Sequence, residues 1–265
     1  MPTTPSKALP RIASLVPSLT ELVFALGLGP HVVARTGFCI HPAEGVGAVP
    51  KVGGTKDVNL DKLRRLAPSH VLVNVDENRL DTVNALREFV PHVLVTHPCT
   101  PEDNLALVDQ IQRAFGNLAP VPERARSLRR DIEQALRDTQ AAGRPARRVL
   151  YLIWRDPWMT VARDTYLSQM LARVNWLTEP EAQGGPSGAA RYPVLRGDEP
   201  WLAAVELVLL SSEPYRFDTS HLSLARALCP NAQALCVDGE ALSWYGPRAV
   251  AGLSLLRQLA NAPLR

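Results

Sequence analysis

The sequence is poor in cysteine and lysine and contains no long apolar run. Its 265 residues include four cysteines, and none of them has the Cys-x-x-Cys spacing of a zinc site or the density of a disulfide scaffold. No stretch reaches the ~20 consecutive apolar residues that a membrane-spanning helix needs. Four of the 29 basic residues are lysine, and the net charge of +3 is too small to favour nucleic acid as a partner.

Sequence signatures of common catalytic sites are also absent. The chain contains no GxSxG, GxxxxGK[ST], GxGxxG or HExxH pattern. Asp156 and Asp164 flank a predicted strand and could form a carboxylate pair, but no nucleophile or base accompanies them, and solvated turn residues are the commoner case. The sequence therefore predicts no catalytic residue and no intrinsic cofactor.

Four residues with metal-binding side chains follow neighbouring predicted strands. They are Cys39, His41, His97 and Cys99, and they could converge as a site for a soft metal. Their spacing matches no established ligand pattern, and buried cysteines and surface histidines are commoner than ligands. We therefore predict no metal site from them.

The beginning of the chain has a superficial likeness to a secretory signal. Lys7 precedes the apolar run 12–29, but Pro17 and Glu21 interrupt this run and no small-residue cleavage site follows it. We expect instead a strand, a turn at Pro17 and a helix that begins at Ser18, with Glu21 completing a capping box. As written, the sequence carries no export signal and is consistent with a cytoplasmic location, but a mature protein trimmed of its signal could look the same, so the location stays open.

Strand and helix patterns alternate along the chain. The predicted strands cover 11–16, 31–35, 70–74, 92–96, 148–154, 159–162, 205–211 and 234–237. The predicted helices cover 18–28, 59–67, 79–90, 101–115, 167–174, 222–228 and 247–261. This alternation predicts an α/β fold of parallel sheets with helices on both faces.

A longer helix is predicted between two such α/β halves. Apolar residues recur at helical spacing between Pro122 and Gly143, most clearly at Ala125, Leu128 and Ile132. Proline suits the first turn of a helix and glycine its end. We expect an N-terminal lobe over 1–118, a bridging helix over 119–145, with most of 121–141 helical, and a C-terminal lobe over 146–265.

Candidate binding residues are those that follow the predicted strands, because ligands of open parallel sheets lie at the carboxyl ends of the strands. Four of the five tryptophans, at 154, 158, 201 and 244, lie at or near such an end or at a lobe edge, and could offer a flat apolar platform to a large planar ligand. The alternative is that each packs as ordinary core. The residues selected at strand ends are Phe38, His41, Thr55, Asn78, Arg79, Trp154, Arg155, Trp158, Glu213, Trp244 and Tyr245.

Several motifs resemble one known family. They are Ser14–Glu21 (SLVPSLTE), Val52–Thr55 (VGGT), Asn59–Asp61 (NLD), Leu66–Pro68 (LAP), Tyr151–Met159 (YLIWRDPWM) and Ser211–Tyr215 (SSEPY). With the single long helix, they make the chain similar to the periplasmic binding proteins for vitamin B12 and iron–siderophore complexes. The resemblance implies a substrate-binding protein of class III, with two Rossmann-like lobes bridged by one helix, that is not an enzyme.

The resemblance also implies a set of ligand contacts in a cleft between the two lobes. His41, Trp158, Tyr192 and Thr55 fall where the vitamin B12-binding receptors have tyrosine, phenylalanine, tryptophan and tryptophan. Phe38, Trp154, Trp244 and Tyr245 supply further aromatic surface.

Polar groups would orient such a ligand. The resemblance implies cobalamin or a ferric chelate, which carries its own metal, so the protein needs no metal ligands of its own. Arg79, Arg155 and Glu213 are the expected orienting residues, and His41 could reach an open axial position on the metal.

The resemblance further implies a partner, the permease of an ABC transporter. The family docks its permease through one carboxylate on each lobe. The matching positions are Asp61 in the first lobe and Asp198 in the second, with Glu199 beside it.

Two other hypotheses remain open from the residues alone. The first is a cytoplasmic enzyme or cofactor carrier built on the same scaffold, which the missing export signal favours. The second is a zinc or manganese receptor, which would need about three or four His, Asp or Glu ligands that meet at one place; the scattered histidines argue against it.

Overall fold

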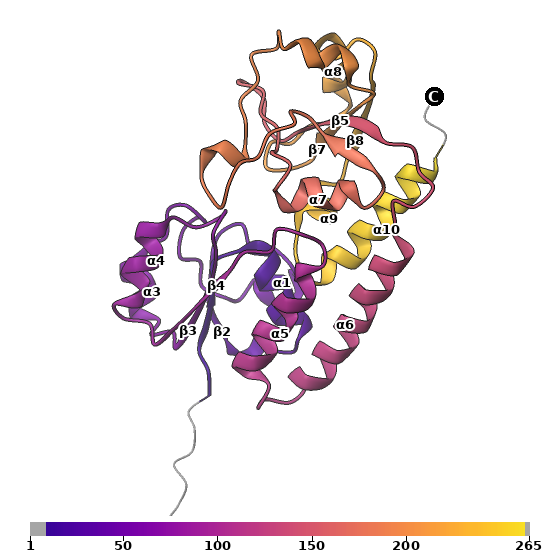
Figure 1. Cartoon of the computed structure of the whole chain (residues 1–265). Coiled ribbons are helices and arrows are strands. Elements are labelled where there is room, and N and C mark those ends of the chain that lie inside the picture. Colours follow the sequence, from indigo (N-terminus) through magenta and orange to yellow (C-terminus); the bar gives the residue numbers. More distant parts are fainter. Residues whose placement is uncertain (1–8, 263–265) are drawn as a thin grey trace, which may run out of the picture. The chain divides into compact units, whose positions relative to one another are not determined.

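The computed structural model describes residues 9–262 of the chain (Figure 1). Lys7, which the sequence analysis compared with the start of a secretory signal, lies outside these residues. The chain forms two compact units. The first unit comprises the residues up to His97 and Ile111–Arg126, and the second comprises Pro98–Gln110 and the chain from Ser127 onward.

Each unit contains one four-stranded parallel sheet. In the first unit the strands lie in the order β2-β1-β3-β4, and in the second in the order β6-β5-β7-β8. The strands are β1 (Ile12–Ser14), β2 (Val32–Arg35), β3 (His70–Asn74), β4 (His92–Thr96), β5 (Arg147–Leu152), β6 (Trp176–Thr178), β7 (Leu207–Ser211) and β8 (Gln233–Val237). The two units thus repeat one topology, which confirms the predicted α/β fold with two parallel sheets.

Helices follow the strands along the chain. They are α1 (Pro17–Ala25), α2 (Ala43–Val46), α3 (Leu60–Arg65), α4 (Leu80–Arg87), α5 (Asp103–Phe115), α6 (Val121–Asp138), α7 (Tyr166–Ala172), α8 (Leu222–Leu228), α9 (Gly239–Ser243) and α10 (Pro247–Asn261). Among the described residues, no helix is both long and apolar enough to cross a membrane.

Each sheet is buried on both faces, as parallel sheets usually are. In the first unit Ala13 and Leu15 from the β1 region pack with Val71 and Val73 of β3 on one face. In the second unit, residues 149–152 of β5 and Leu207–Leu210 of β7 are continuous apolar runs with almost no exposed surface. Burial of both faces explains why these strands appear in the sequence as short uninterrupted apolar runs.

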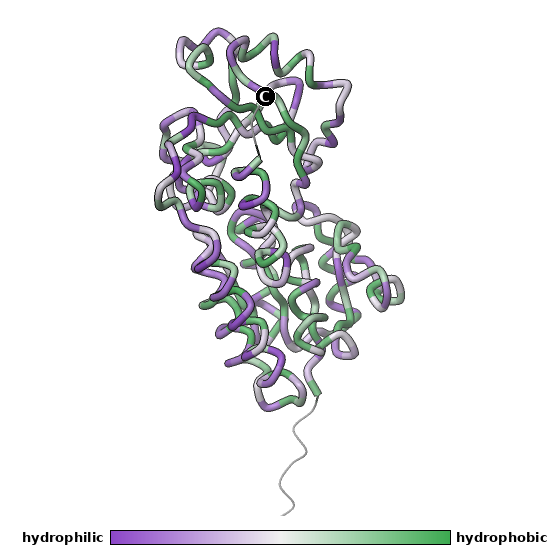
Figure 2. The backbone as a smooth tube through the Cα atoms, turned by 90° about the vertical axis from the view of Figure 1, so that its right-hand side faces the viewer, coloured by the Kyte–Doolittle hydropathy of each residue, from purple (hydrophilic) through white to green (hydrophobic). Residues whose placement is uncertain are grey.

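The long helix forms where the sequence predicts it. α6 buries Val121, Ala125, Ile132 and Leu136, which lie on one side at helical spacing. Hydrophilic and hydrophobic positions alternate along it (Figure 2). The helix continues from the first unit into the second, but it ends at Asp138, earlier than the glycine expected to stop it.

The predicted capping box at the start of α1 is wrong. The helix begins at Pro17, one residue earlier than expected, and its N-cap is Val16, whose side chain cannot cap. Ser18 therefore lies inside the first turn, where its hydroxyl is buried and has no hydrogen-bond partner among the described residues. Proline suits this first position because it lacks the N–H that the helix would leave unpaired.

The predicted strand over 159–162 is also wrong. Met159 makes single bridges to Trp154 and Val194, and no continuous ladder follows. The sheet position beside β5 belongs instead to β6, which pairs in parallel through Trp176, Leu177 and Thr178. Three residues are too few for a periodic pattern, so sequence reasoning missed this strand.

Candidate functional site

The strand order places a switch point in each sheet. The chain moves from β1 outward to β2 on one side and to β3 on the other, and β5 is related to β6 and β7 in the same way. Ligands of open α/β sheets bind beyond the carboxyl ends of the strands at such a point. We call this edge of each sheet its carboxyl edge, and describe it for each unit separately.

In the first unit, Asn78 ties together the chain at the switch point. Its Nδ2 donates to the carbonyl oxygens of Leu15 at 3.3 Å and Thr55 at 2.9 Å, and its Oδ1 accepts from the N–H of Asn74 at 2.9 Å. The side chain is buried. The structure thus brings two predicted site residues, Asn78 and Thr55, together, with Asn78 as a support for the segment that carries Thr55.

Other predicted residues of the first unit lie on the same edge with different exposure. Phe38 is 64% exposed, and a Cβ on Gly54 would stand 3.4 Å from its ring. Arg79 is exposed at the N-cap of α4, while His41 is half-buried. Phe38 and Arg79 can therefore meet a ligand without rearrangement of the unit.

In the second unit, aromatic side chains gather where β5 and β7 end. The ring of Trp154 meets the edge of Tyr215 at 5.6 Å, and Trp158 stacks on Phe217 with centroids 6.0 Å apart. Tyr215 and His221 meet at 5.6 Å. We call these five residues the aromatic cluster. Trp154 is 40% exposed, whereas Trp158 is half-buried against the core below it.

Sequence reasoning missed three members of the aromatic cluster. All three follow β7: Tyr215 packs on Trp154 and Phe217 on Trp158, the two predicted tryptophans, whereas His221 packs on Tyr215 and Phe217. The available signal was the pair of aromatic residues, Tyr215 and Phe217, a few residues after the end of β7. His221 gave no local signal, because its place against Tyr215 depends on the short helix that holds it.

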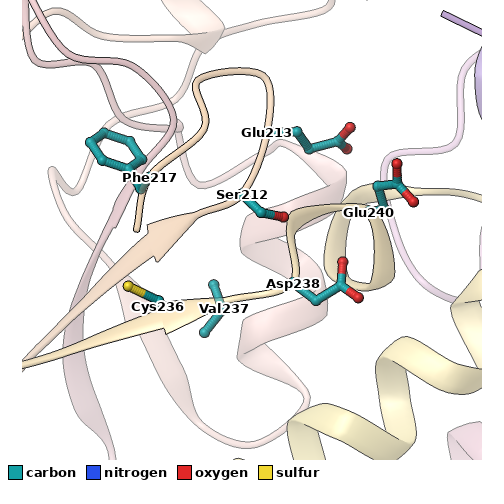
Figure 3. Close-up of a pocket in the computed structure, with 7 residues that line it drawn as sticks. All are labelled: Ser212, Glu213, Phe217, Cys236, Val237, Asp238 and Glu240. Carbon is teal, nitrogen blue, oxygen red and sulfur yellow. The ribbon is translucent and has the colours of Figure 1, made fainter. Parts of the chain in front are cut away.

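A pocket of about 470 Å³ opens beyond the carboxyl ends of β7 and β8 (Figure 3). The carboxylates of Glu213, Asp238 and Glu240 gather on one side, and Phe217 and Cys236 lie on the other (Figure 3). Ser212 and Val237 complete the lining. The pocket therefore joins an acidic wall to an edge of the aromatic cluster.

Glu213 is the best-anchored acid of this pocket. Its Oε1 accepts from the indole N–H of Trp244 at 2.7 Å and from the hydroxyl of Ser243 at 2.8 Å. Burial raises the pKa of Glu213 above its usual value, the two hydrogen bonds oppose this rise, and the nearby Glu240 and Asp238 add to it. The carboxyl group therefore takes up a proton more readily than an exposed glutamate.

The remaining predicted residues of the second unit differ in their surroundings. Trp244 and Tyr245 are 7% and 6% exposed, so they offer little surface to a ligand in this conformation. Tyr245 packs edge-on against Tyr166 at 4.8 Å. Tyr192 is half-buried at the end of a short helix, and the guanidinium of Arg155 lies 5.9 Å from the ring centroid of Trp158.

The three predicted docking carboxylates belong to surface segments of their units. Asp61 is exposed in the first turn of α3. Asp198 is 76% exposed and accepts from Nε of Arg196 at 3.0 Å. Both oxygens of Glu199 accept backbone N–H bonds, from Arg196 and Gly197.

The side chains considered for metal binding or as a carboxylate pair have other partners. Within residues 9–262, no group of three or more His, Cys, Asp and Glu side chains could hold a metal ion, so Cys39, His41, His97 and Cys99 do not form the site considered from the sequence. Asp164 instead accepts the backbone N–H groups of Gly184 and Gly185. Asp156 is 84% exposed beside Arg155.

Two α/β units of one topology, with aromatic and polar groups at their carboxyl edges, define the class: the fold is that of a two-lobed α/β substrate-binding protein. The chain belongs to the periplasmic binding protein family, whose model matches residues 12–179.

Curated relatives and solved structures agree with this assignment. The vitamin B12-binding protein of Yersinia pestis (strain Pestoides F) is 28% identical over 179 residues, which cover 64% of this chain and 60% of the relative. The match thus spans less than two thirds of that relative's length. The periplasmic vitamin B12 binding protein of Vibrio cholerae has a TM-score of 0.77 at 19% identity, over 95% of this chain and 96% of that one. A periplasmic heme binding protein from Pseudomonas aeruginosa has a TM-score of 0.77 at 22% identity, over 97% and 95%.

Proposed function

We propose that this protein captures a metal chelate with a large apolar face, of the corrinoid or haem type, and delivers it to the permease of an ABC transporter. The observation that carries the proposal is the aromatic cluster at the carboxyl edge of the second unit, in a member of the periplasmic binding protein family. The curated relatives are named for vitamin B12, and several proteins of the same fold are named for heme.

The aromatic cluster suits such a ligand for a physical reason. A tetrapyrrole or corrin ring presents a broad apolar surface, and rigid aromatic side chains bury such a surface with little loss of side-chain entropy. Trp154 is the most exposed ring of the cluster, and Phe38 of the first unit is exposed as well. That both contact the same ligand remains a prediction, as do the roles of His41, Thr55, Asn78 and Tyr192.

Polar contacts would then select among ligands of this shape. Arg79 and Arg155 offer guanidinium groups to carboxylates or carbonyl oxygens, and Glu213 offers an acceptor or, when protonated, a donor. The ligand supplies its own metal, and we propose that the protein acts by binding and not by catalysis. This role accords with the family, whose members are binding proteins.

Direct titration of the purified protein tests the proposal. Cyanocobalamin, haemin and ferrichrome are added in turn, and binding is followed by the visible spectrum of the chelate and by quenching of tryptophan fluorescence. We expect cyanocobalamin or haemin to bind with a Kd of about 1 μM or tighter, that is about −8 kcal/mol or better. If neither binds at concentrations up to about 100 μM, or if only ferrichrome binds, the proposed ligand class is wrong.

A further inference from the structure

Arg35 lies where a loop of the first unit leaves the sheet and returns to it. The strand β2 ends at this residue, and the backbone returns to it: the N–H of Arg35 donates to Pro50 O at 3.0 Å, and the N–H of Val52 donates to Arg35 O at 2.8 Å. Residues 36–50, which we call the β2 loop, therefore leave and rejoin the sheet at a single residue.

The side chain of Arg35 fills the inside of the β2 loop. Its Nε donates to Val46 O at 2.8 Å, and its Nη1 donates to Thr36 O at 3.2 Å and Cys39 O at 3.0 Å. Arg35 is 5% exposed, so water does not compete for these bonds. One rigid planar group thus joins three points of the loop, two near its beginning at Thr36 and Cys39 and one further along at Val46.

Further bonds fix the loop to the sheet. The thiol of Cys39 lies 3.1 Å from the hydroxyl of Thr36 and 3.8 Å from Ser14 O, and the N–H of Gly37 donates to Gly53 O at 2.7 Å. Cys39 is fully buried. The side chains on either side of it must therefore point away from the core.

These neighbours of Cys39 are apolar and exposed. Phe38 is 64% exposed and Ile40 is 52% exposed. Single exposed apolar residues are ordinary, but two on one braced loop form a preformed apolar tip at the carboxyl edge. A tip that is already rigid loses little conformational entropy when it binds.

We propose that Arg35 is a positioning residue: it braces the β2 loop so that Phe38 and Ile40 meet an apolar face of the ligand. The inference rests on the proposed function and adds to it a contact, Ile40, and a support, Arg35. Arg35 does not touch the ligand, because its side chain is buried and donates to the carbonyl oxygens of the loop. An apolar tip fits a macrocyclic chelate and would contribute nothing to a bare metal ion.

The first test is the substitution Arg35→Lys. A lysine has a single nitrogen and cannot replace the separate Nε and Nη1 bonds, so the loop should loosen while the charge is kept. We expect at least a tenfold rise in Kd for whichever of cyanocobalamin and haemin the wild type binds. We also expect faster hydrogen exchange at the N–H groups of Gly37 and Cys39, measured in the ligand-free protein.

The matched control is Arg11→Lys. Arg11 is exposed and donates to two carbonyl oxygens of the first unit where Arg35 donates to three, those of Ala67 at 3.1 Å and Leu66 at 2.6 Å, and it lies at the amino edge of the same sheet, next to the start of β1. This variant should bind like the wild type. An equal loss of affinity in both variants would mean that Arg35 acts only through the stability of the unit, and would overturn the proposal.

A double-mutant cycle separates positioning from general stability. The variant Phe38→Ala/Ile40→Ala changes two exposed side chains and should fold normally, with at least a tenfold weaker affinity. Added to it, Arg35→Lys should weaken binding by less than twofold further, because the tip that it supports is already gone. Independent, additive losses, or wild-type affinity of either variant, would overturn the proposal.

If Arg35→Lys fails to fold, two other measurements still test the proposal. If Phe38→Ala/Ile40→Ala binds with wild-type affinity, Phe38 and Ile40 do not contact the ligand. If the N–H groups of Gly37 and Cys39 exchange without protection in the wild type, Arg35 does not hold the β2 loop rigid. Failure of the proposed function looks different, because the wild type itself would then bind neither cyanocobalamin nor haemin.

Discussion

At the scale of single residues, the contribution of Trp158 to core packing can be separated from its predicted contribution to ligand binding. Trp158 is half-buried, stacks on Phe217 and packs against the core of the second unit, and the family resemblance predicts that it is also a ligand anchor. We expect Trp158→Ala to lower the free energy of unfolding by about 2–3 kcal/mol, less than for a fully buried tryptophan. We also expect at least a tenfold loss of affinity, measured by calorimetry below the melting temperature.

Trp201→Ala is the matched control, because Trp201 packs against the same core and, although it is one of the four tryptophans near a strand end or lobe edge, it was not selected as a ligand contact. Trp201→Ala should have a lower melting temperature than the wild type and an unchanged affinity for the ligand. A Trp158→Ala protein that behaves in the same way would show that Trp158 is a core residue and not an anchor.

The second prediction at this scale concerns the protonation of Glu213. Burial, chiefly, raises its pKa in the folded state, so the folded protein holds this proton more tightly than the unfolded chain does. Stability must then fall as the pH rises from about the ordinary glutamate value through the raised folded pKa. Glu213→Gln removes this loss and keeps an oxygen to accept from Trp244 and Ser243.

The measurement is urea unfolding of the wild type and Glu213→Gln between pH 4 and 8. The unfolding free energy of Glu213→Gln minus that of the wild type should increase as the pH rises. Glu88→Gln, at an exposed position, serves as the control. If this difference stays constant or decreases over this range, the pKa of Glu213 is not raised in the folded protein.

At the scale of elements, Asn104 holds α5 to its neighbours in the second unit. Its Nδ2 donates to the hydroxyl of Tyr166 at 2.9 Å and to Pro101 O at 2.9 Å, and its Oδ1 accepts from the N–H of Gly246 at 2.7 Å, just before α10. Asn104 has no exposed surface. One amide thus joins α5, α7 and the start of α10, although the last two lie far along the chain.

We expect Asn104→Ala to lower the free energy of unfolding by about 2–4 kcal/mol, because it leaves the Tyr166 hydroxyl and the Gly246 N–H unpaired in the interior. Denaturant unfolding measures the change. Asn84→Ala, at an exposed position on α4, should stay within about 0.5 kcal/mol of the wild type. Similar losses of unfolding free energy in the two variants would contradict the structural role of Asn104.

At the scale of the whole molecule, we predict that the proposed transport role depends on the exposed carboxylates Asp61 and Asp198. The variant Asp61→Arg/Asp198→Arg should lose stimulation of the permease ATPase in reconstituted vesicles, because like charges would then face the arginines that the family resemblance implies. Ligand affinity should stay within about twofold of the wild type, since neither residue belongs to the predicted contacts.

Asp131→Arg, an exposed charge reversal on α6, tests whether any added positive charge has the same effect. Stimulation should survive in this control. Normal stimulation by the double variant would show that the permease, if it is the partner, docks elsewhere.

Much of the fold follows from local pattern. The apolar runs of β1, β3, β5 and β7 and the helical spacing of α6 depend on neighbours within a few residues, so they can be found without knowledge of the rest of the chain. The carboxyl edges follow as well, because an alternation of strands and helices makes the sheets parallel. Family membership also rests on contiguous motifs and was confirmed by the family model.

The candidate site is predictable only in part. Trp154 and Phe38 could be selected because they follow strands directly, and both are exposed. Trp244 met the same criterion and is nearly buried, since its indole N–H is directed to Glu213, 31 residues away in the chain. Position after a strand sets which edge a residue occupies, but not which way its side chain points.

The sequence by itself therefore determined the class of fold, the edges where binding groups lie and the family. Only the tertiary structure decided how side chains are used: that Arg35 braces a loop, that Asn104 joins three helices and that Ser18 caps nothing. The physical reason is the range of the interactions. Backbone conformation follows from local sterics and periodicity, whereas burial and hydrogen-bond partners depend on residues that only folding brings together, up to 142 positions apart for Asn104 and Gly246.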